Sequence, residues 1–173
     1  MVLPLIKEKE TRESGRRGMG RRGAFEREDK EFDQVIIDLA RVTRVTKGGK
    51  RMRFRACVVI GDRKGRVGYG VAKGADVTIA VNKAVRVAKK SLLMVRLVNE
   101  TIPGRVKAKF GAAELILKPA PKGAGIIAGG AARDVLALAG VPNVVTKSLG
   151  GKNKINSIKA VFKALTILNR KRA

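Results

Sequence analysis

The chain has 173 residues, with 39 lysines and arginines against 14 aspartates and glutamates, so its formal net charge at pH 7 is +25. Such a charge repels itself in a compact free monomer, which favours a polyanionic partner. The one apolar run near the N-terminus, Met1 to Ile6, stops at Lys7 and is too short for a signal peptide or a membrane span. Nucleic acid is therefore favoured over a membrane surface, and no membrane is required.

Cysteine, histidine and aromatic usage narrows the class further. Cys57 is the one cysteine and histidine is absent, which excludes an internal disulfide and argues against a zinc site. Cys57 lies in an apolar strand pattern, so we expect a buried small hydrophobe in a reduced, cytoplasmic compartment. Aromatics make up only 3% of the chain and tryptophan is absent, which disfavours proteins that stack single-stranded bases and favours shaped, mostly double-helical RNA.

Residues 1–31 are predicted to be a disordered, charged arm. The stretch from Arg12 to Arg27 mixes glycine with arginine and has no periodicity that could bury a face. It is either a solvated tail or an arm that becomes ordered on RNA. We favour the arm, and its possible RNA contacts are Arg16, Arg17, Arg21 and Arg22.

A β-hairpin is expected next. A strand over 35–46 leads through the turn Lys47-Gly48-Gly49-Lys50 into a second strand over 51–61. In the second strand one face carries apolar residues, and the other carries Arg51, Arg53 and Arg55. Three arginines on one face are typical of a surface that meets phosphates.

A third strand, 66–72, and a helix, 76–93, complete the expected domain of residues 32–95. Apolar residues recur along the helix at helical spacing, and Lys83, Arg86 and Lys90 fall on roughly the opposite side. Three strands and one helix with basic loops are half of the architecture of a double-stranded-RNA-binding domain.

The segment from Glu100 to Gly104 breaks the pattern and is the expected domain boundary. Beyond it a strand, strand, loop, helix, strand, helix order predicts a two-layer α/β sandwich over 101–169, followed by a basic tail over 170–173. The expected elements are strands over 106–110, 113–118 and 143–149, a glycine-rich loop over 119–130, a helix over 131–139 and a last helix with Asn153 as its N-cap. The fold class is therefore α+β.

An enzyme is not expected. Residues 123–128 fit the loose dinucleotide fingerprint G-x-G-x-x-G/A, but the next strand ends in Lys147, Ser148 and Leu149, without the acid that would bind a ribose. No P-loop sequence occurs, and eight of the fourteen acids lie in the first 33 residues. We expect no catalytic residue, no metal and no cofactor.

Several motifs, in the same order along the chain, resemble those of the bacterial family of small-subunit ribosomal protein five. The resemblance runs from about Phe32 to Leu168. The motifs are Thr43-Arg44-Val45-Thr46-Lys47-Gly48-Gly49, Val67-Gly68-Tyr69-Gly70 followed by Ala72-Lys73-Gly74, Gly125-Ile126-Ile127-Ala128-Gly129-Gly130, and Ala139-Gly140-Val141-Pro142-Asn143-Val144.

The resemblance implies a double-stranded-RNA-binding-like N-terminal domain and a C-terminal domain with a left-handed β-α-β crossover. It also implies a place in the small subunit near the messenger entry path, beside small-subunit proteins three, four and eight. A link to decoding accuracy and spectinomycin sensitivity would run through the first hairpin loop, here Thr43 to Arg51. The chain departs from a regular double-stranded-RNA-binding domain because the glycine–arginine segment stands where the leading helix would be.

The sequence thus predicts a non-catalytic component of the cytoplasmic small ribosomal subunit that binds ribosomal RNA and forms no homo-oligomer. A nucleotide enzyme and a free RNA chaperone remain the alternatives. The expected RNA contacts are Lys47, Gly48, Gly49, Lys50, Arg51, Arg53, Arg55, Lys64, Arg66, Lys73, Lys83, Arg86 and Lys90. The glycine-rich loop is expected to be a tight turn and a possible protein or phosphate contact through Lys122, Gly123, Gly125, Gly129 and Gly130.

Overall fold

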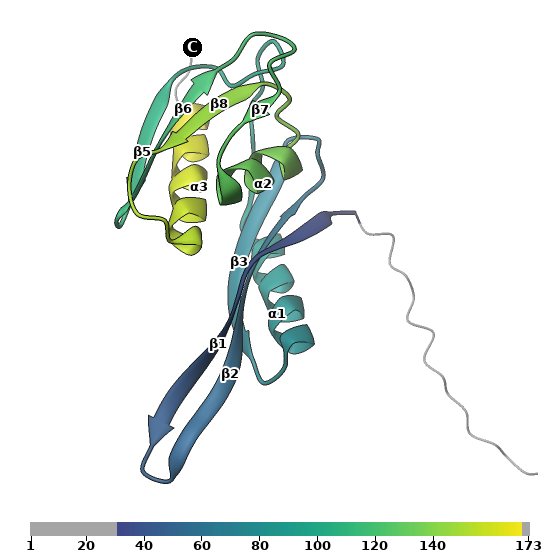
Figure 1. Cartoon of the computed structure of the whole chain (residues 1–173). Coiled ribbons are helices and arrows are strands. Elements are labelled where there is room, and N and C mark those ends of the chain that lie inside the picture. Colours follow the sequence, from purple (N-terminus) through teal and green to yellow (C-terminus); the bar gives the residue numbers. More distant parts are fainter. Residues whose placement is uncertain (1–30, 171–173) are drawn as a thin grey trace, which may run out of the picture.

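The computed structural model describes residues 31–170, which form two β-sheets and three helices (Figure 1). The first sheet has the order β1-β2-β3-β4, and the second has the order β5-β6-β8-β7. In chain order the elements are β1 (Asp33–Thr46), β2 (Gly49–Gly61), β3 (Arg66–Gly74), α1 (Val77–Lys90), β4 (Leu92–Met94), β5 (Val106–Phe110), β6 (Ala113–Pro119), β7 (Ile126–Ile127), α2 (Gly130–Leu138), β8 (Val144–Ser148) and α3 (Lys154–Arg170).

The two faces of β2 bury different neighbours, because successive strand side chains point to opposite faces. Ala56, Val58 and Ile60 pack with the alanines of α1, as the alternation predicts. Cys57 and Val59 pack with α2, α3 and the second sheet in one continuous core. The described chain is therefore layered as α1, first sheet, α2 with α3, and second sheet (Figure 1).

The α1 helix lies directly on the backbone of β3. Its inner stripe, Ala80, Ala84 and Ala88, is fully buried. Opposite this stripe β3 offers Gly68 and Gly70, where an added Cβ would come within 2.6 and 2.0 Å of helix carbonyl oxygens. Small residues on both elements thus set how closely the helix approaches the sheet.

The second sheet has one buried face, which packs on α2 and α3. Its strands β5, β6 and β8 are antiparallel neighbours, while β7 pairs parallel with β8. A parallel β7-α2-β8 unit is therefore present, and its left-handed sense stays a prediction. Asn153 caps α3 as expected, since its Oδ1 accepts hydrogen bonds from the N–H groups of Ile155 and Asn156.

Three expectations about the elements need correction. The helix expected over 76–93 ends at Lys90, because the Ser91 hydroxyl donates to the Tyr69 and Val87 carbonyls and Leu92–Met94 pairs with β3, so the first sheet has a fourth strand. The two-residue strand β7 was not expected, since Ile126–Ile127 is too short for a periodic signal. The segment Thr43 to Arg51 is almost wholly strand, and only Lys47 and Gly48 form the turn.

The glycine-rich loop is held by the buried side chain of Asn143. Its Oδ1 accepts from the Gly125 N–H at 3.1 Å, and its Nδ2 donates to the Glu100 carbonyl at 3.3 Å. The Asn143 carbonyl also accepts from the Thr101 hydroxyl at 2.7 Å. One side chain therefore connects the loop before α2, the segment between the sheets and the start of β8.

Replacing Asn143 by alanine is expected to destabilise the fold by about 2 kcal/mol, because it leaves the Gly125 N–H and the Glu100 carbonyl, whose hydrogen bonds to Asn143 are partly buried, without these partners. The measurement is the free energy of unfolding from urea titration. Asn82, which is exposed on α1 and forms no side-chain hydrogen bond in the described residues, gives the control: Asn82→Ala should be neutral or slightly stabilising. Equal losses for both variants would contradict the role of Asn143.

Cys57 is fully buried, as the sequence predicts. Burial raises the pKa of its thiol to about 11, and the nearby Asp38 carboxylate adds to the rise. Since the thiolate is the reactive form, the folded protein at pH 8 should react with iodoacetamide at least ~100-fold more slowly than the urea-unfolded chain. Similar rates in the two states would show that Cys57 is accessible in the fold.

Candidate nucleic-acid interface

The β1–β2 hairpin projects beyond the rest of the first sheet (Figure 1). Strand β3 pairs with β2 only from Phe54 onward. The preceding residues of β2, 49–53, pair with β1 alone, so 42–53 form a two-stranded arm that is exposed on both faces. The arm ends in the turn Lys47-Gly48, with Thr46 Oγ1 donating to the Gly49 carbonyl at 3.1 Å.

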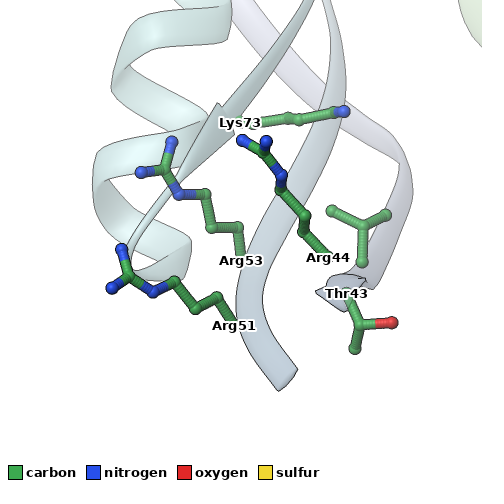
Figure 2. Close-up of a pocket in the computed structure, with 6 residues that line it drawn as sticks. Thr43, Arg44, Arg51, Arg53 and Lys73 are labelled. Atoms are coloured by element: carbon green, nitrogen blue, oxygen red, sulfur yellow. The ribbon is translucent and has the colours of Figure 1, made fainter. Parts of the chain in front are cut away.

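Four cationic side chains gather on one face of this arm. We call Arg44, Arg51, Arg53 and Lys73 the arginine cluster. With Val42 and Thr43 they line a hollow of about 270 Å³ (Figure 2). The pairing register explains their grouping, because Arg44 lies opposite Arg51, and Lys73 lies opposite Arg55, two residues along β2 from Arg53.

The sequence prediction missed Arg44, although the turn contains the necessary signal. A two-residue hairpin turn fixes the register of its strands. With Thr46 opposite Gly49, Arg44 must fall opposite Arg51. The cluster therefore takes residues from three strands, and Arg44 of β1 is the member that the prediction lacked.

The arginine cluster is electrostatically unfavourable without an anion. Like charges directly opposite each other on neighbouring strands destabilise a sheet. Arg44 and Arg51 are such a pair, and among residues 31–170 no member of the cluster forms an ion pair. A polyanion bound in the hollow would turn this repulsion into attraction.

Arg55 lies on the same face but is engaged within the fold. Its Nη2 lies 3.2 Å from Asp38 Oδ2, and both side chains are partly buried. The face of β2 that carries Arg51, Arg53 and Arg55 continues into Cys57 and Val59, which lie under α2 and α3. Only the outer half of the predicted phosphate-facing surface is therefore open.

Arg66 also has internal partners. Its Nε lies 2.7 Å from Asp62 Oδ2, its Nη2 lies 3.3 Å from Glu31 Oε1, and its guanidinium sits over the Phe32 ring. Burial opposes ionisation of Asp62, but hydrogen bonds from Arg66 and from the Lys64 N–H outweigh it and lower the pKa of that carboxyl. We therefore omit Arg55 and Arg66 from the proposed RNA contacts.

The remaining expected contacts lie apart from the arginine cluster. Lys47 and Lys50 are exposed near the tip of the arm, and Lys64 is exposed in the β2–β3 turn beside the end of α2. Lys83, Arg86 and Lys90 are exposed on α1, which covers the other face of the first sheet. The expected residues thus do not form one continuous surface.

The glycine-rich loop has the tight geometry that the sequence predicts. Gly123 and Gly125 adopt φ angles of +86° and +70°, and Gly129 precedes the first turn of α2. Lys122 lies 3.8 Å from Glu100, so its charge is partly compensated. A protein or phosphate contact at this loop stays a prediction.

Other site classes have little support in the described residues. Residues 31–170 contain no group of three potential metal ligands and no helix long and apolar enough to cross a membrane. The four arginines expected to bind RNA from the arm over 1–31, Arg16, Arg17, Arg21 and Arg22, lie outside the described residues. The fold and the site define a class: an α+β protein with two stacked sheets and an exposed cationic sheet face suited to a polyanion.

Comparison with known proteins identifies the family. Residues 32–96 match the N-terminal domain of ribosomal protein S5, and residues 108–172 match its C-terminal domain. The chain is 49% identical over 146 residues to the small ribosomal subunit protein uS5 of Mycoplasma mobile. The aligned segment covers 84% of this chain and 60% of that relative. The chain belongs to the ribosomal protein S5 family, a family of ribosomal structural proteins and not of enzymes.

Proposed function

We propose that the chain is a non-catalytic component of the small ribosomal subunit in the cytoplasm, where it binds ribosomal RNA through the arginine cluster and the tip of the hairpin arm. The observation that carries the proposal is the arginine cluster itself, with Arg44 directly opposite Arg51 and no carboxylate partner within residues 31–170. Family membership supports the ribosomal setting.

The shape of the arm supports insertion between RNA segments. A two-stranded ribbon with both faces exposed can be approached by phosphates from two sides. Lys47 and Lys50 near the tip add charge where the arm would reach furthest. By this account the arm holds the shape of an RNA junction near the messenger entry path and so supports decoding accuracy, beside small-subunit proteins three, four and eight.

The test is the salt dependence of binding to small-subunit ribosomal RNA. Each phosphate neutralised contributes about 0.9 to the slope of log K against log salt on duplex RNA. Arg51→Ala/Arg53→Ala should therefore reduce the slope by about 2 and weaken binding roughly 10-fold or more at moderate salt.

The matched control removes two exposed arginines away from the cluster, Arg96→Ala/Arg170→Ala. It should leave the slope nearly unchanged, and both double variants should keep the circular dichroism of the parent chain. A salt response that is flat for the parent, or equal for the two variants, contradicts the proposal. Stoichiometric presence in purified small subunits separates this role from that of a free RNA chaperone.

A further inference from the structure

The second sheet has a face that nothing in the described residues covers. Its buried face, with Val106, Leu115 and Val144, packs toward α2 and α3. Residues that alternate with these point the other way. The register places Lys107, Ile116 and Lys147 in one row across β5, β6 and β8, with Lys118 beside Val145 in a neighbouring row.

This outer sheet face is strongly cationic. We define it by its charged residues, Arg105, Lys107, Lys109, Glu114, Lys118 and Lys147. Glu114 is its one carboxylate and is paired with Lys107, whose Nζ lies 2.6 Å from Oε1. The hydrogen bond from Lys107 lowers the pKa of Glu114. Among residues 31–170 the other four cations form no ion pair.

Part of the face is hollowed. A depression of about 260 Å³ is lined by three apolar residues, Ile116, Val145 and Leu149, and by three cationic residues, Arg105, Lys118 and Lys147. Cationic residues beside apolar ones match a sugar–phosphate backbone, whose riboses are less polar than the phosphates beside them. This lining suits a neutral protein surface poorly, because the three cations would be desolvated without partners.

The spacing of the sheet also suits RNA. Neighbouring strands lie ~4.8 Å apart, so Lys107 and Lys147, two strands apart, are separated by about 10 Å. A duplex carries roughly one phosphate per 1.7 Å of helix axis. Several phosphates can therefore face the outer sheet face without a special register.

We propose that the outer sheet face is a second RNA-binding surface, which holds the sugar–phosphate backbone of a segment different from the one at the arginine cluster. The two surfaces belong to different sheets, with α2 and α3 between the sheets (Figure 1). One chain thus bridges two RNA segments. This proposal rests on the RNA-binding role above but not on the arginine cluster.

The experiment measures binding of the full chain to small-subunit ribosomal RNA across a salt series. Arg105→Ala/Lys118→Ala/Lys147→Ala should reduce the salt slope by about 2 to 3 and weaken binding at least ~10-fold. Combined with Arg51→Ala/Arg53→Ala, the reductions in slope should add, since distant sites act independently. The control is again Arg96→Ala/Arg170→Ala.

Other results for these variants would overturn the proposal or change the surface that binds RNA. Unchanged RNA binding by the triple variant overturns the proposal. If that variant also fails to enter small subunits, the face docks a protein instead. Loss of binding in the triple variant but not in Arg51→Ala/Arg53→Ala keeps this proposal and removes the arginine cluster from the proposed function. Should the triple variant not fold, Lys118→Gln/Lys147→Gln removes two charges while keeping side-chain length.

Discussion

Replacing Gly70 by alanine is expected to destabilise the fold by about 3 kcal/mol or more, because the new methyl group would collide with the backbone of α1. A Cβ at this position would lie 2.0 Å from the Ala84 carbonyl oxygen and 2.9 Å from the Ala88 nitrogen. Backbone atoms inside a helix cannot yield separately, so the whole helix would have to move away from β3. The measurement is the free energy of unfolding from urea titration, together with the melting temperature.

Gly48 provides the matched control for the same substitution. It lies in the hairpin turn with nothing within 4 Å of an added Cβ and without a positive φ angle. Gly48→Ala should therefore change stability by no more than about 0.5 kcal/mol. If Gly70→Ala unfolds at the same urea concentration as Gly48→Ala, α1 does not lie against β3 as closely as described.

Much of the fold is predictable because the signals for its elements are local. Alternation in β2 correctly assigned Ala56, Val58 and Ile60 to one face, and helical spacing placed Ala80 on the buried side of α1. Asn153 was recognisable as a helix cap from its type and position. Each of these signals lies within one element, so the pattern needs no knowledge of what the element packs against.

The features that the sequence did not predict depend on contacts between residues far apart in the chain. Arg55 was expected to face phosphate, but it pairs with Asp38 from β1, across a register shift between Ile36 and Asp38 that no local pattern specifies. Burial of Cys57 was expected, but the elements that cover it and Val59 are helices more than 70 residues later in the chain. Such covering is set by how the two sheets stack.

The candidate sites also depend on residues far apart in the chain. Charge alone predicts a polyanionic partner, and the distribution of lysine and arginine pointed to the first sheet. The outer sheet face escaped attention because its cations are scattered over β5, β6 and β8 and meet only once the order β5-β6-β8 is known. Cationic surfaces of this kind are properties of sheet order, which sequence spacing does not determine.

The contact between the two halves of the chain leads to the second large effect, expected for Gly140→Ala. Gly140 follows α2 with a φ angle of +74°, and an added Cβ would lie 2.0 Å from the Arg63 carbonyl oxygen in the β2–β3 turn. Two backbone hydrogen bonds join the same region, from the Arg63 N–H to the Leu138 carbonyl and from the Gly65 N–H to the Ala139 carbonyl, each at 3.0 Å. The substitution should push the first sheet away from the end of α2.

Gly140→Ala is expected to lower the free energy of unfolding by about 3 kcal/mol. Left-handed backbone strain accounts for about 1 kcal/mol, and the loss of close packing between Gly140 and the β2–β3 turn accounts for the rest. Because the core is continuous across the two sheets, the parent chain should unfold in a single transition. Gly140→Ala should broaden or split that transition, since the two halves lose part of their coupling. Urea unfolding followed by far-ultraviolet circular dichroism and by exposure of Cys57 to iodoacetamide measures both effects.

Gly123→Ala separates backbone strain from the steric clash, because Gly123 has a φ angle of +86° with nothing within 4 Å of an added Cβ. This variant should lower the free energy of unfolding only by the cost of the strain, about 1 kcal/mol, and should keep a single unfolding transition. Equal losses for Gly140→Ala and Gly123→Ala would mean that strain alone matters and that the β2–β3 turn does not press on the end of α2. A larger loss at Gly140 with a split transition is the expected result, because there the clash lies between two backbones that belong to different halves of the fold.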